Sequence, residues 1–336
     1  MEYRRLGRSG LKVSPLCLGV MMFGDRTDDA EAGRIVTAAR DAGVNFIDTA
    51  DAYARGESER VTGRLIAADR TRWVLATKVS NPMSDDINDR GASRRWLLAA
   101  ADASLRRLGT DYIDLWYLHR DDIETPLEET VGALGDLIRA GKIRHIGLSN
   151  FRAWRIAAFA AMCDRLGVPR PIACQPCYNA MDRTPEIELL PCCEAFGLGV
   201  VPYSPLARGV LTAKYAEGAA PPADTRAGRN DRRMLQTEFR PESLALAKRV
   251  AQRAGARGMT AGQLALNWVL NSAVITSVIA GPRTLAQWTD YLGALDKDFT
   301  AEDEAFFDSL VPAGHPSTAG YSDPQYPVAG RRPRVG

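Results

Sequence analysis

The sequence predicts an α/β fold: a (β/α)8 TIM barrel with an N-terminal hairpin and a long lid loop after the seventh strand. Short runs of apolar and β-branched residues alternate with longer amphipathic runs, and this rhythm repeats about eight times along the chain. The length of 336 residues suits a single large barrel domain. Titratable side chains directly follow several of the apolar runs, which is where a parallel barrel places its chemistry.

The eight expected strands are short apolar segments that end in polar or glycine-containing turns. They cover residues 14–19, 45–50, 72–78, 112–119, 144–149, 171–177, 198–204 and 277–281. Amphipathic segments predict helices over residues 28–43, 56–68, 92–109, 126–142, 153–167 and 260–272, and a last helix begins near Arg283. Several of these helices end in Gly shortly after a basic residue, which is a common C-terminal capping pattern.

Three segments lie outside this alternation. Residues 2–14 are polar and glycine-broken, which predicts a small hairpin that plugs the bottom of the barrel. Residues 206–239 form a long insertion rich in Gly, Pro, Ala and Arg, and such loops in compact domains are usually lids or disordered. We therefore expect one barrel domain over residues 1–311. Residues 312–336 predict an extended tail near the barrel mouth, with a solvated basic cluster at Arg331, Arg332 and Arg334.

The composition is that of a globular protein without a nucleic-acid or membrane partner. Hydrophobic residues make up 46%, charged residues 25%, and the formal net charge is +2, all close to average values. No stretch reaches the roughly eighteen consecutive apolar residues of a membrane span. The first residues lack the apolar core of a signal peptide. We expect a cytoplasmic protein, monomeric or homo-oligomeric, that acts on a small molecule.

The six cysteines lie mostly in apolar runs, as expected of reduced core thiols. Cys174 and Cys177, together with Cys192 and Cys193, could supply four soft ligands to a metal ion. The first pair, however, falls in an expected strand with Pro176 between its members, unlike a zinc-binding turn. We therefore expect packing and no metal.

Four polar residues at the ends of three expected strands suggest acid–base chemistry: Asp48, Tyr53, Lys78 and His119. A tyrosine beside a lysine, itself beside an aspartate, predicts a phenol whose pKa is lowered from its usual value of about 10. Such a phenol can donate a proton near neutral pH. Asp48 and Lys78 alone could equally be a structural ion pair between adjacent strands, and Tyr53 and His119 favour the catalytic interpretation.

Signatures of the common nucleotide-binding loops are missing from the sequence. Gly19 and Gly24 after the first strand are too widely spaced for a Rossmann fingerprint, and there is no phosphate-binding P-loop. Polar residues at later strand ends suit a nicotinamide and its ribose instead: Ser149, Asn150, Gln175, Tyr203 and Ser204. Gly281 lies in the turn after the last strand, and Arg283 lies near a helix start, where both the helix N-terminus and arginine favour phosphate.

From Tyr3 to about Leu310 the chain resembles the aldo-keto reductases, and it is most similar to bacterial members and to the channel-associated β subunits. The motifs that carry the resemblance are LGVMMFG, NFIDTADAYARGESE, LATK, TDYIDLWYLHR, GLSN, CQPCYN, PYSPLARGVLTAKY and GPRTLAQWTDY. The resemblance implies an (α/β)8 barrel that binds NADP(H) extended across its C-terminal face. It also implies a proton-donor set at Asp48, Tyr53, Lys78 and His119.

The resemblance further implies the residues that hold the cofactor. Near the reacting ring these are Gly19, Val20, Met21, Asp48, Ser149, Asn150 and Gln175, with Tyr203 stacked on the nicotinamide. Toward the pyrophosphate they are Ser204, Pro205, Leu206, Arg208, Gly209 and Lys214, with Arg226 in the lid, and at the adenosine end Gly281, Arg283, Gln287 and Asp290. Two positions depart from the pattern: Val20 replaces a common Thr, and Asp290 with Tyr291 replaces a common Glu-Asn pair.

The expected reaction is hydride transfer to an aldehyde or ketone carbon, with Tyr53 as proton donor. Lys78 would supply positive charge, Asp48 would keep Lys78 charged, and His119 would orient the carbonyl. Arg283 would favour NADPH over NADH by pairing with the 2′-phosphate. Met21, Met22 and Phe23 predict an apolar pocket for varied aldehydes. Trp116 lies close in sequence to His119, and it either joins this pocket or is turned away by strand alternation.

Two other functions compete with this one. The first is a cofactor-binding regulatory subunit with little catalysis, as in the channel-associated relatives. Those relatives have Asn where this chain has His119, which favours the enzyme. The second is a barrel enzyme that binds the phosphate of a sugar at the turn after the eighth strand.

Overall fold

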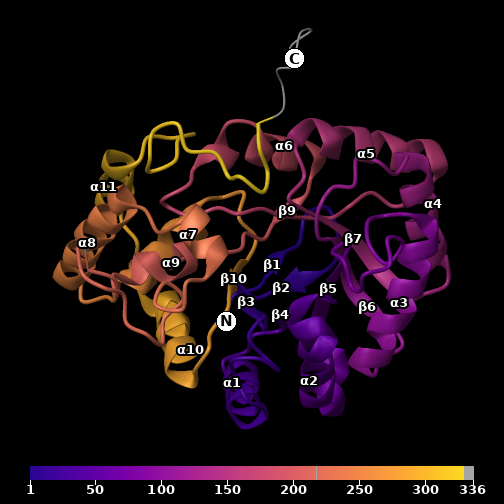
Figure 1. Ribbon diagram of the computed structural model, residues 1–336, viewed down its shortest axis with the longest axis horizontal. Helices are drawn as coiled ribbons and strands as arrows, with labels where there is room; N and C mark the ends of the chain where they lie inside the picture. Colours follow the sequence, from indigo (N-terminus) through magenta and orange to yellow (C-terminus); the bar gives the residue numbers. More distant parts are fainter. Residues whose placement is uncertain (217, 329–336) are drawn as a thin grey trace, which may run out of the picture.

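Eight parallel strands form the centre of the fold in a computed structural model that describes residues 1–216 and 218–328 (Figure 1). The strands are β3 (Leu16–Gly19), β4 (Phe46–Asp48), β5 (Val74–Val79), β6 (Ile113–Leu118), β7 (Ile143–Ser149), β8 (Ala173–Gln175), β9 (Gly199–Val200) and β10 (Val278–Ala280). They are ordered β10-β3-β4-β5-β6-β7-β8-β9. Each expected strand is found in sequence order, so the predicted (β/α)8 barrel is confirmed.

The sheet curls until its two outer strands approach each other. An isolated parallel bridge joins Val200 of β9 to Ile275, in the segment that leads to β10. Two backbone hydrogen bonds strengthen this seam: Thr276 N donates to Val200 O at 2.9 Å, and Ile279 N donates to Pro202 O at 3.0 Å. The N-terminal strand β3 pairs with β10 in register Leu16 to Val278, so the first and last barrel strands are neighbours.

The N-terminal hairpin plugs the barrel, as predicted. Its strands are β1 (Arg4–Arg5) and β2 (Lys12–Val13), which pair antiparallel. Leu6 and Val13 are fully buried and pack in one cluster with apolar side chains of the barrel interior, including Phe46 and Leu115. The inside of the barrel is therefore a packed core closed from below.

Helices surround the strands on the outside (Figure 1). The six predicted from amphipathic periodicity are α1 (Asp29–Asp41), α2 (Glu57–Ile66), α3 (Arg94–Leu108), α4 (Leu127–Arg139), α5 (Ala153–Leu166) and α9 (Ala261–Asn271), and the predicted last helix corresponds to α10 (Leu285–Leu292). Gly109 and Gly167 follow α3 and α5 with φ of +62° and +64°, a conformation that glycine adopts without strain.

Four helices were not predicted: α6 (Leu189–Phe196), α7 (Arg232–Thr237), α8 (Pro241–Ala256) and α11 (Ala301–Leu310). The lid after β9 is consequently not structureless. It contains a 3-10 turn, η4 (Ala207–Thr212), and α7, which begins at an Asp231 cap that accepts from Met234 N. No helix in the described ranges is long and apolar enough to cross a membrane.

The segment after α11 returns to the barrel mouth. Asp323 forms a two-point ion pair with Arg233 of α7 at 2.9 and 2.7 Å, and Arg152 donates to the carbonyl oxygen of Tyr326 at 2.7 Å. These contacts hold the segment across the top of the barrel, where its residues stay half-buried or exposed. The basic cluster at residues 331–334 lies outside the described residues.

Candidate active site

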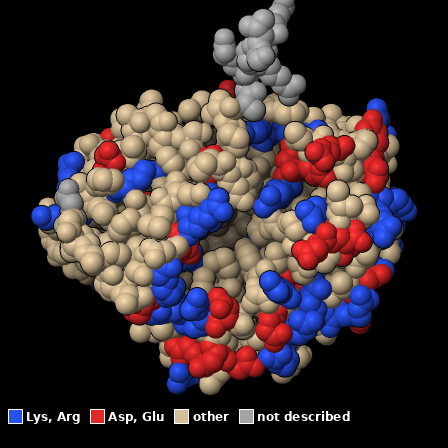
Figure 2. All heavy atoms as spheres, in the orientation of Figure 1, with Lys and Arg blue, Asp and Glu red and all other residues tan. Residues whose placement is uncertain are grey.

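A cavity of about 670 Å³ opens at the carboxyl ends of the barrel strands. Figure 2 shows it as a hollow near the centre of this face, with Lys and Arg side chains on its rim. All residues expected around the cofactor line this one cavity: Gly19, Val20, Met21, Asp48, Ser149, Asn150, Gln175, Tyr203, Ser204, Pro205, Leu206, Arg208, Gly209, Lys214, Arg226, Gly281, Arg283, Gln287 and Asp290. Tyr53 and His119 line it as well, whereas Lys78 lies behind its wall with no exposed surface.

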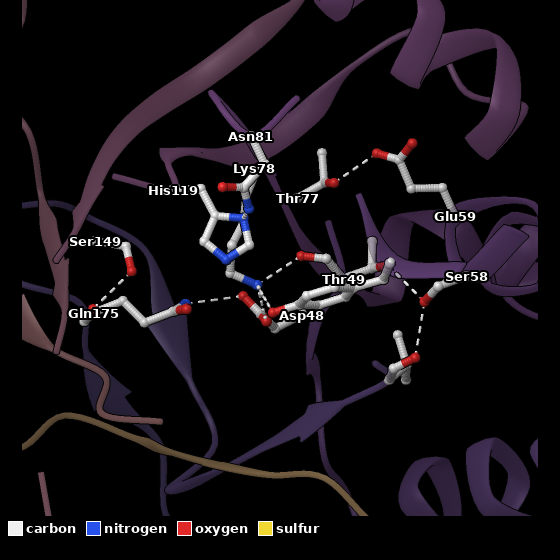
Figure 3. Close-up of polar contacts among 12 residues, drawn as sticks. Asp48, Thr49, Ser58, Glu59, Thr77, Lys78, Asn81, His119, Ser149 and Gln175 are labelled. Carbon is white, nitrogen blue, oxygen red and sulfur yellow. Dashed lines mark hydrogen bonds and ion pairs between the residues drawn. The ribbon is translucent and has the colours of Figure 1, made fainter. Parts of the chain in front are cut away.

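Lys78 is the centre of a buried polar cluster beneath the cavity (Figure 3). Its ammonium forms an ion pair with Asp48 and donates to Thr49 O at 2.7 Å and to the Tyr53 hydroxyl at 3.2 Å. Asp48 is the last residue of β4, and Lys78 lies near the end of β5. Because β4 pairs with β5, the two side chains come together at the same end of the sheet. The three donor bonds fill the capacity of the ammonium, so the Tyr53 hydroxyl proton points to a partner elsewhere.

The pKa of Tyr53 departs from the sequence-based prediction. Burial raises the pKa of the phenol above its usual value, and the nearby Lys78 ammonium offsets only part of this effect. The expectation of a lowered pKa was wrong because it counted the cation and not the desolvation. Lys78 itself loses stabilisation of its charge on burial, but Asp48 and Tyr53 more than restore it and raise its pKa. The pair is therefore a charged lysine beside a protonated phenol.

His119 lies across from Tyr53, with the two ring centroids 5.7 Å apart and the planes at 84°. Its Nδ1 is 2.9 Å from the Asn81 amide nitrogen, which donates to it and leaves the ring proton on Nε2. Burial lowers the His119 pKa well below its usual range, and Lys78 and Arg120 lower it further by repulsion. A neutral imidazole with a proton on Nε2 can donate a hydrogen bond to an oxygen in the cavity.

A second hydrogen-bond network lies on the far side of the cluster. Gln175 donates to Asp48 at 3.0 Å, and Ser149 donates to Gln175 O at 2.8 Å (Figure 3). Asn150 donates to His119 O at 2.9 Å and accepts from the Tyr203 hydroxyl at 2.8 Å. The ends of β7 and β8 are thereby tied to the ion pair, so amide, hydroxyl and aromatic groups share one wall of the cavity.

The lid side of the cavity is crowded with cations. Burial lowers the pKa of Lys214, and repulsion from Arg226 and Arg283 lowers it further. Burial likewise lowers the pKa of Arg226, whose only ion pair in the described chain is with Asp231 at 3.6 Å. Gly209 has a φ of +98°, and a Cβ there would lie 2.9 Å from Lys214 Nζ. Cations held this close with few counter-charges suit a polyanion such as a dinucleotide pyrophosphate.

Arg283 closes the lid over this side. Its guanidinium donates to the Asp224 backbone oxygen at 2.9 Å and to the Asp224 carboxylate at 3.2 Å. The start of α10 is already partly satisfied, because Leu285 N donates to Glu31 at 2.6 Å. The helix N-terminus anticipated from the sequence as a phosphate site is therefore only partly available, and the Arg283 side chain remains the main candidate.

Two residues at the outer end are fixed by neighbouring helices. Gln287 accepts from Arg283 N at 2.7 Å, and Asp290 accepts from Thr260 at 3.0 Å and from the Gln263 amide at 3.1 Å. Asp290 thus has hydrogen-bond partners without any ligand. Its carboxylate can accept a further donor, such as an exocyclic amine of a base.

Several cavity residues were missed by the sequence analysis: Asn81, Arg120, Thr212, Asp224, Thr225, Arg229, Arg233, Ala286, Gln325 and Tyr326. Asn81 and Arg120 follow β5 and β6 closely, so the rule that found Lys78 and His119 could have found them too. Gln325 and Tyr326 carry no such signal, because they reach the cavity only through the return of the C-terminal segment.

The apolar side of the cavity agrees with the sequence only in part. Met21 and Met22 line it, while Phe23 is fully buried and lies in the core. Trp116 is fully buried among core side chains and does not line the cavity, so of the two outcomes left open strand alternation turns it away. All six cysteines are free thiols, and the described residues contain no cluster of His, Cys, Asp and Glu that could hold a metal ion.

Comparison with known proteins places this geometry in a family. The model of the aldo/keto reductase family matches residues 15–312. A probable voltage-gated potassium channel subunit beta of Oryza sativa is 38% identical, with 88% of this chain and 92% of that protein aligned. An uncharacterized oxidoreductase of Bacillus subtilis is 36% identical (93% and 96%), and an L-glyceraldehyde 3-phosphate reductase of Escherichia coli is 33% identical (94% and 93%). The chain therefore belongs to the aldo/keto reductase family.

Proposed function

We propose that this protein is an NADPH-dependent reductase that converts aldehydes or ketones to alcohols, with Tyr53 as the proton donor. Membership of the aldo/keto reductase family and its reductase-named relatives support an oxidoreductase acting on carbonyl compounds. The observation that carries the finer proposal is the position of the Tyr53 hydroxyl, 3.2 Å from the Lys78 ammonium at the wall of a cavity that it shares with neutral His119.

The charges of the cluster match the needs of carbonyl reduction. When bound, the nicotinamide supplies the hydride that goes to the carbonyl carbon. Negative charge then develops on the carbonyl oxygen, and the Tyr53 hydroxyl gives its proton there while Lys78 stabilises the phenolate that is left. His119 holds the same oxygen through Nε2–H, and Asp48 keeps Lys78 charged inside the protein. Asn81 positions His119 by occupying Nδ1.

The wall formed by Ser149, Asn150, Gln175 and Tyr203 fits the carboxamide and the face of a nicotinamide ring. The crowded cations at Lys214 and Arg226 fit the pyrophosphate. We further propose that NADPH is preferred to NADH, because Arg283 is a half-buried guanidinium at the outer end of the cavity that can pair with a 2′-phosphate. Comparing the affinities of the two cofactors by fluorescence quenching tests this preference, and equal affinities would refute it.

Replacement of Tyr53 by Phe tests the proton donor. We expect kcat for aldehyde reduction to fall by about 10² to 10⁴, because a positioned proton donor contributes this much to rate. Tyr3→Phe is the matched control, since its hydroxyl lies just ahead of the hairpin and donates to Gly43 O in the turn after α1. Loss of NADPH absorbance gives the rate, and fluorescence titration shows whether the variant still binds the cofactor. Turnover that matches the control would rule out Tyr53 as donor.

A cofactor-binding regulatory subunit is the second candidate, because the Oryza sativa relative is named a probable channel subunit. His119 and its Asn81 contact favour the enzyme, since they add a donor aimed into the cavity. Failure of purified protein to oxidise NADPH with any aldehyde or ketone would favour the regulatory subunit. The six free thiols suit a reducing compartment, so we keep the proposal of a cytoplasmic protein, monomeric or homo-oligomeric.

A further inference from the structure

Arg120 is a cavity residue without a hydrogen-bond or ion-pair partner in the described part of the chain. It directly follows His119, lines the cavity, and its buried Nε has no hydrogen-bond acceptor among the residues that the structure describes. No ion pair of Arg120 is found within residues 1–216 and 218–328. A guanidinium that is partly removed from water and left without an acceptor is costly, and such groups usually serve a ligand or a strain-bearing site.

The acids closest in sequence cannot neutralise Arg120, because other groups hold them. Asp121 accepts from Arg155 Nε at 3.0 Å. Asp122 accepts from Ala92 N at 2.8 Å and from the Thr125 hydroxyl at 2.7 Å. The sequence thus places two carboxylates directly after Arg120, but in the fold both accept hydrogen bonds from other groups.

The C-terminal segment also lines this cavity. Tyr326 and Gln325 line the same cavity, and the Arg152 contact with the Tyr326 carbonyl fixes this part of the chain. Burial raises the Tyr326 pKa, and the positive charge of Arg120 is the largest influence that opposes the rise. The phenol hydroxyl and the guanidinium thus give this cavity two hydrogen-bond donors and no negative charge.

The part of the cavity beside Arg120 differs from the rest in how its cations are paired. Lys214, Arg226 and Arg283 lie on the lid side, where the proposed cofactor phosphates bind. Arg233 is neutralised by its two-point contact with Asp323. Arg120 is therefore the cation of the described cavity that stands on the side of Tyr53 and His119 and has no counter-ion there.

We propose that Arg120, with the Tyr326 hydroxyl, binds an oxyanion of the substrate, so that the preferred substrates are carbonyl compounds that carry a carboxylate or a phosphate close to the reacting group. Arg120 is adjacent to His119 in the chain, so an anionic group held there leaves the carbonyl of the same small molecule at Tyr53 and His119. The inference rests on the proposed reductase function and adds the substrate class to it. The arginine acts on binding and positioning, not on the proton.

Matched pairs of aldehydes test the proposal. The carboxylate pair is 4-carboxybenzaldehyde and its neutral ester, methyl 4-formylbenzoate, and the phosphate pair is glyceraldehyde 3-phosphate and glyceraldehyde. We expect wild-type protein to have a higher kcat/KM for the charged member of at least one pair, mainly through KM. The pair that shows the effect identifies the oxyanion. In Arg120→Gln this charged-to-neutral ratio should fall by about tenfold to a hundredfold, the usual range for losing a hydrogen bond to a charged group.

Two further variants control the test. Arg120→Lys keeps the charge and should restore part of the ratio. Arg106→Gln removes one positive charge from an exposed site in the last turn of α3 and should leave the ratio unchanged. Equal kcat/KM for charged and neutral members in wild type, or the same ratio in Arg120→Gln as in wild type, would overturn the proposal.

Binding separates failure of this inference from failure of the proposed function. The affinities of 4-carboxybenzaldehyde and its ester are measured by fluorescence in Tyr53→Phe loaded with NADP⁺, with and without Arg120→Gln. If wild type reduces nothing, but the carboxylate still binds more tightly and loses this advantage with Arg120→Gln, the substrate class stands and the reductase function falls. Equal binding of acid and ester would overturn the inference whatever the activity.

Discussion

Asp51 is a buried carboxyl group in the turn between Asp48 and Tyr53. It is 1% exposed, and neither of its side-chain oxygens has a hydrogen-bond partner within the described ranges. Burial, with repulsion from Glu59, raises its pKa to about 8. The turn between Asp48 and Tyr53 thus carries a carboxyl group that is neutral at neutral pH, close in the chain to the charged pair of Asp48 and Lys78.

Replacement of Asp51 by Asn should make the protein more stable at alkaline pH. The folded pKa is raised, so the wild-type group contributes stability below its unfolded pKa of about 4, and this contribution is lost as pH rises toward 8. Near pH 8 the variant should gain up to about 5 kcal/mol in free energy of unfolding, about 1.4 kcal/mol for each unit between the two pKa values, and near pH 4 the gain should vanish. Urea denaturation at both pH values measures this. A gain independent of pH would show that Asp51 is not protonated in the folded protein.

The pKa values of His119 and Tyr53 predict how the rate of carbonyl reduction depends on pH. His119 has a pKa well below its usual range, so it does not change charge between about pH 6 and 8. Tyr53 has a raised pKa, so it keeps its proton until above about pH 10. We expect kcat/KM for reduction to be flat from pH 6 to 8 and to fall only in the strongly alkaline range. A decline across pH 6 to 7 would mean that His119 titrates there.

The meeting of Asp48, Tyr53, Lys78 and His119 could be predicted because each lies at or shortly after the carboxyl end of an apolar strand, where position in sequence fixes position in a barrel. Their environment could not. The direction of the Tyr53 pKa depends on burial, which the sequence near Tyr53 does not show. Tyr326 lies far along the chain from every strand, and it is brought to the cavity by contacts of the C-terminal segment such as Arg233–Asp323 and Arg152–Tyr326.

Among the elements, the strands were the most predictable, because buried parallel strands are short uninterrupted apolar runs. Helices α6 and α11 were missed for different reasons. α6 is short and contains Pro191, and α11 begins with three acidic residues whose role as a helix start becomes clear only through the Thr300 cap. The lid lacked any periodic pattern, so its 3-10 turn and α7 depend on contacts made elsewhere.

The contact between Arg283 and Asp224 joins the lid to α10. Asp224→Asn should speed dissociation of NADP⁺ by about two- to fivefold, because exposed ion pairs contribute at most about 1 kcal/mol. Stopped-flow displacement of bound cofactor measures the rate. Asp136→Asn on the outer helix α4, which also breaks exposed ion pairs, serves as control. A dissociation rate equal to the control would show that this contact does not restrain the lid.

At the scale of the whole molecule, the hairpin is the base of the barrel. Leu6 is fully buried and packs with Phe46 and Leu115. Leu6→Ala should reduce the free energy of unfolding by about 2 to 5 kcal/mol, the usual cost of a cavity in a core. Leu166→Ala, at a site that is 41% exposed, should cost less than about 1 kcal/mol. Chemical denaturation measures both, and equal losses would show that the hairpin adds no core packing.

The pairing of β3 with β10 sets a condition on how this protein is made. One edge of β3 (residues 16–19) has no partner until β10 (residues 278–280) is synthesised, and β9 gains its second neighbour only with the segment that leads to β10. A growing polypeptide on the ribosome therefore holds a sheet with two open edges for most of its synthesis. Chaperones that bind unpaired strand edges can therefore act during most of translation. A truncated chain that ends before β10 cannot close its barrel.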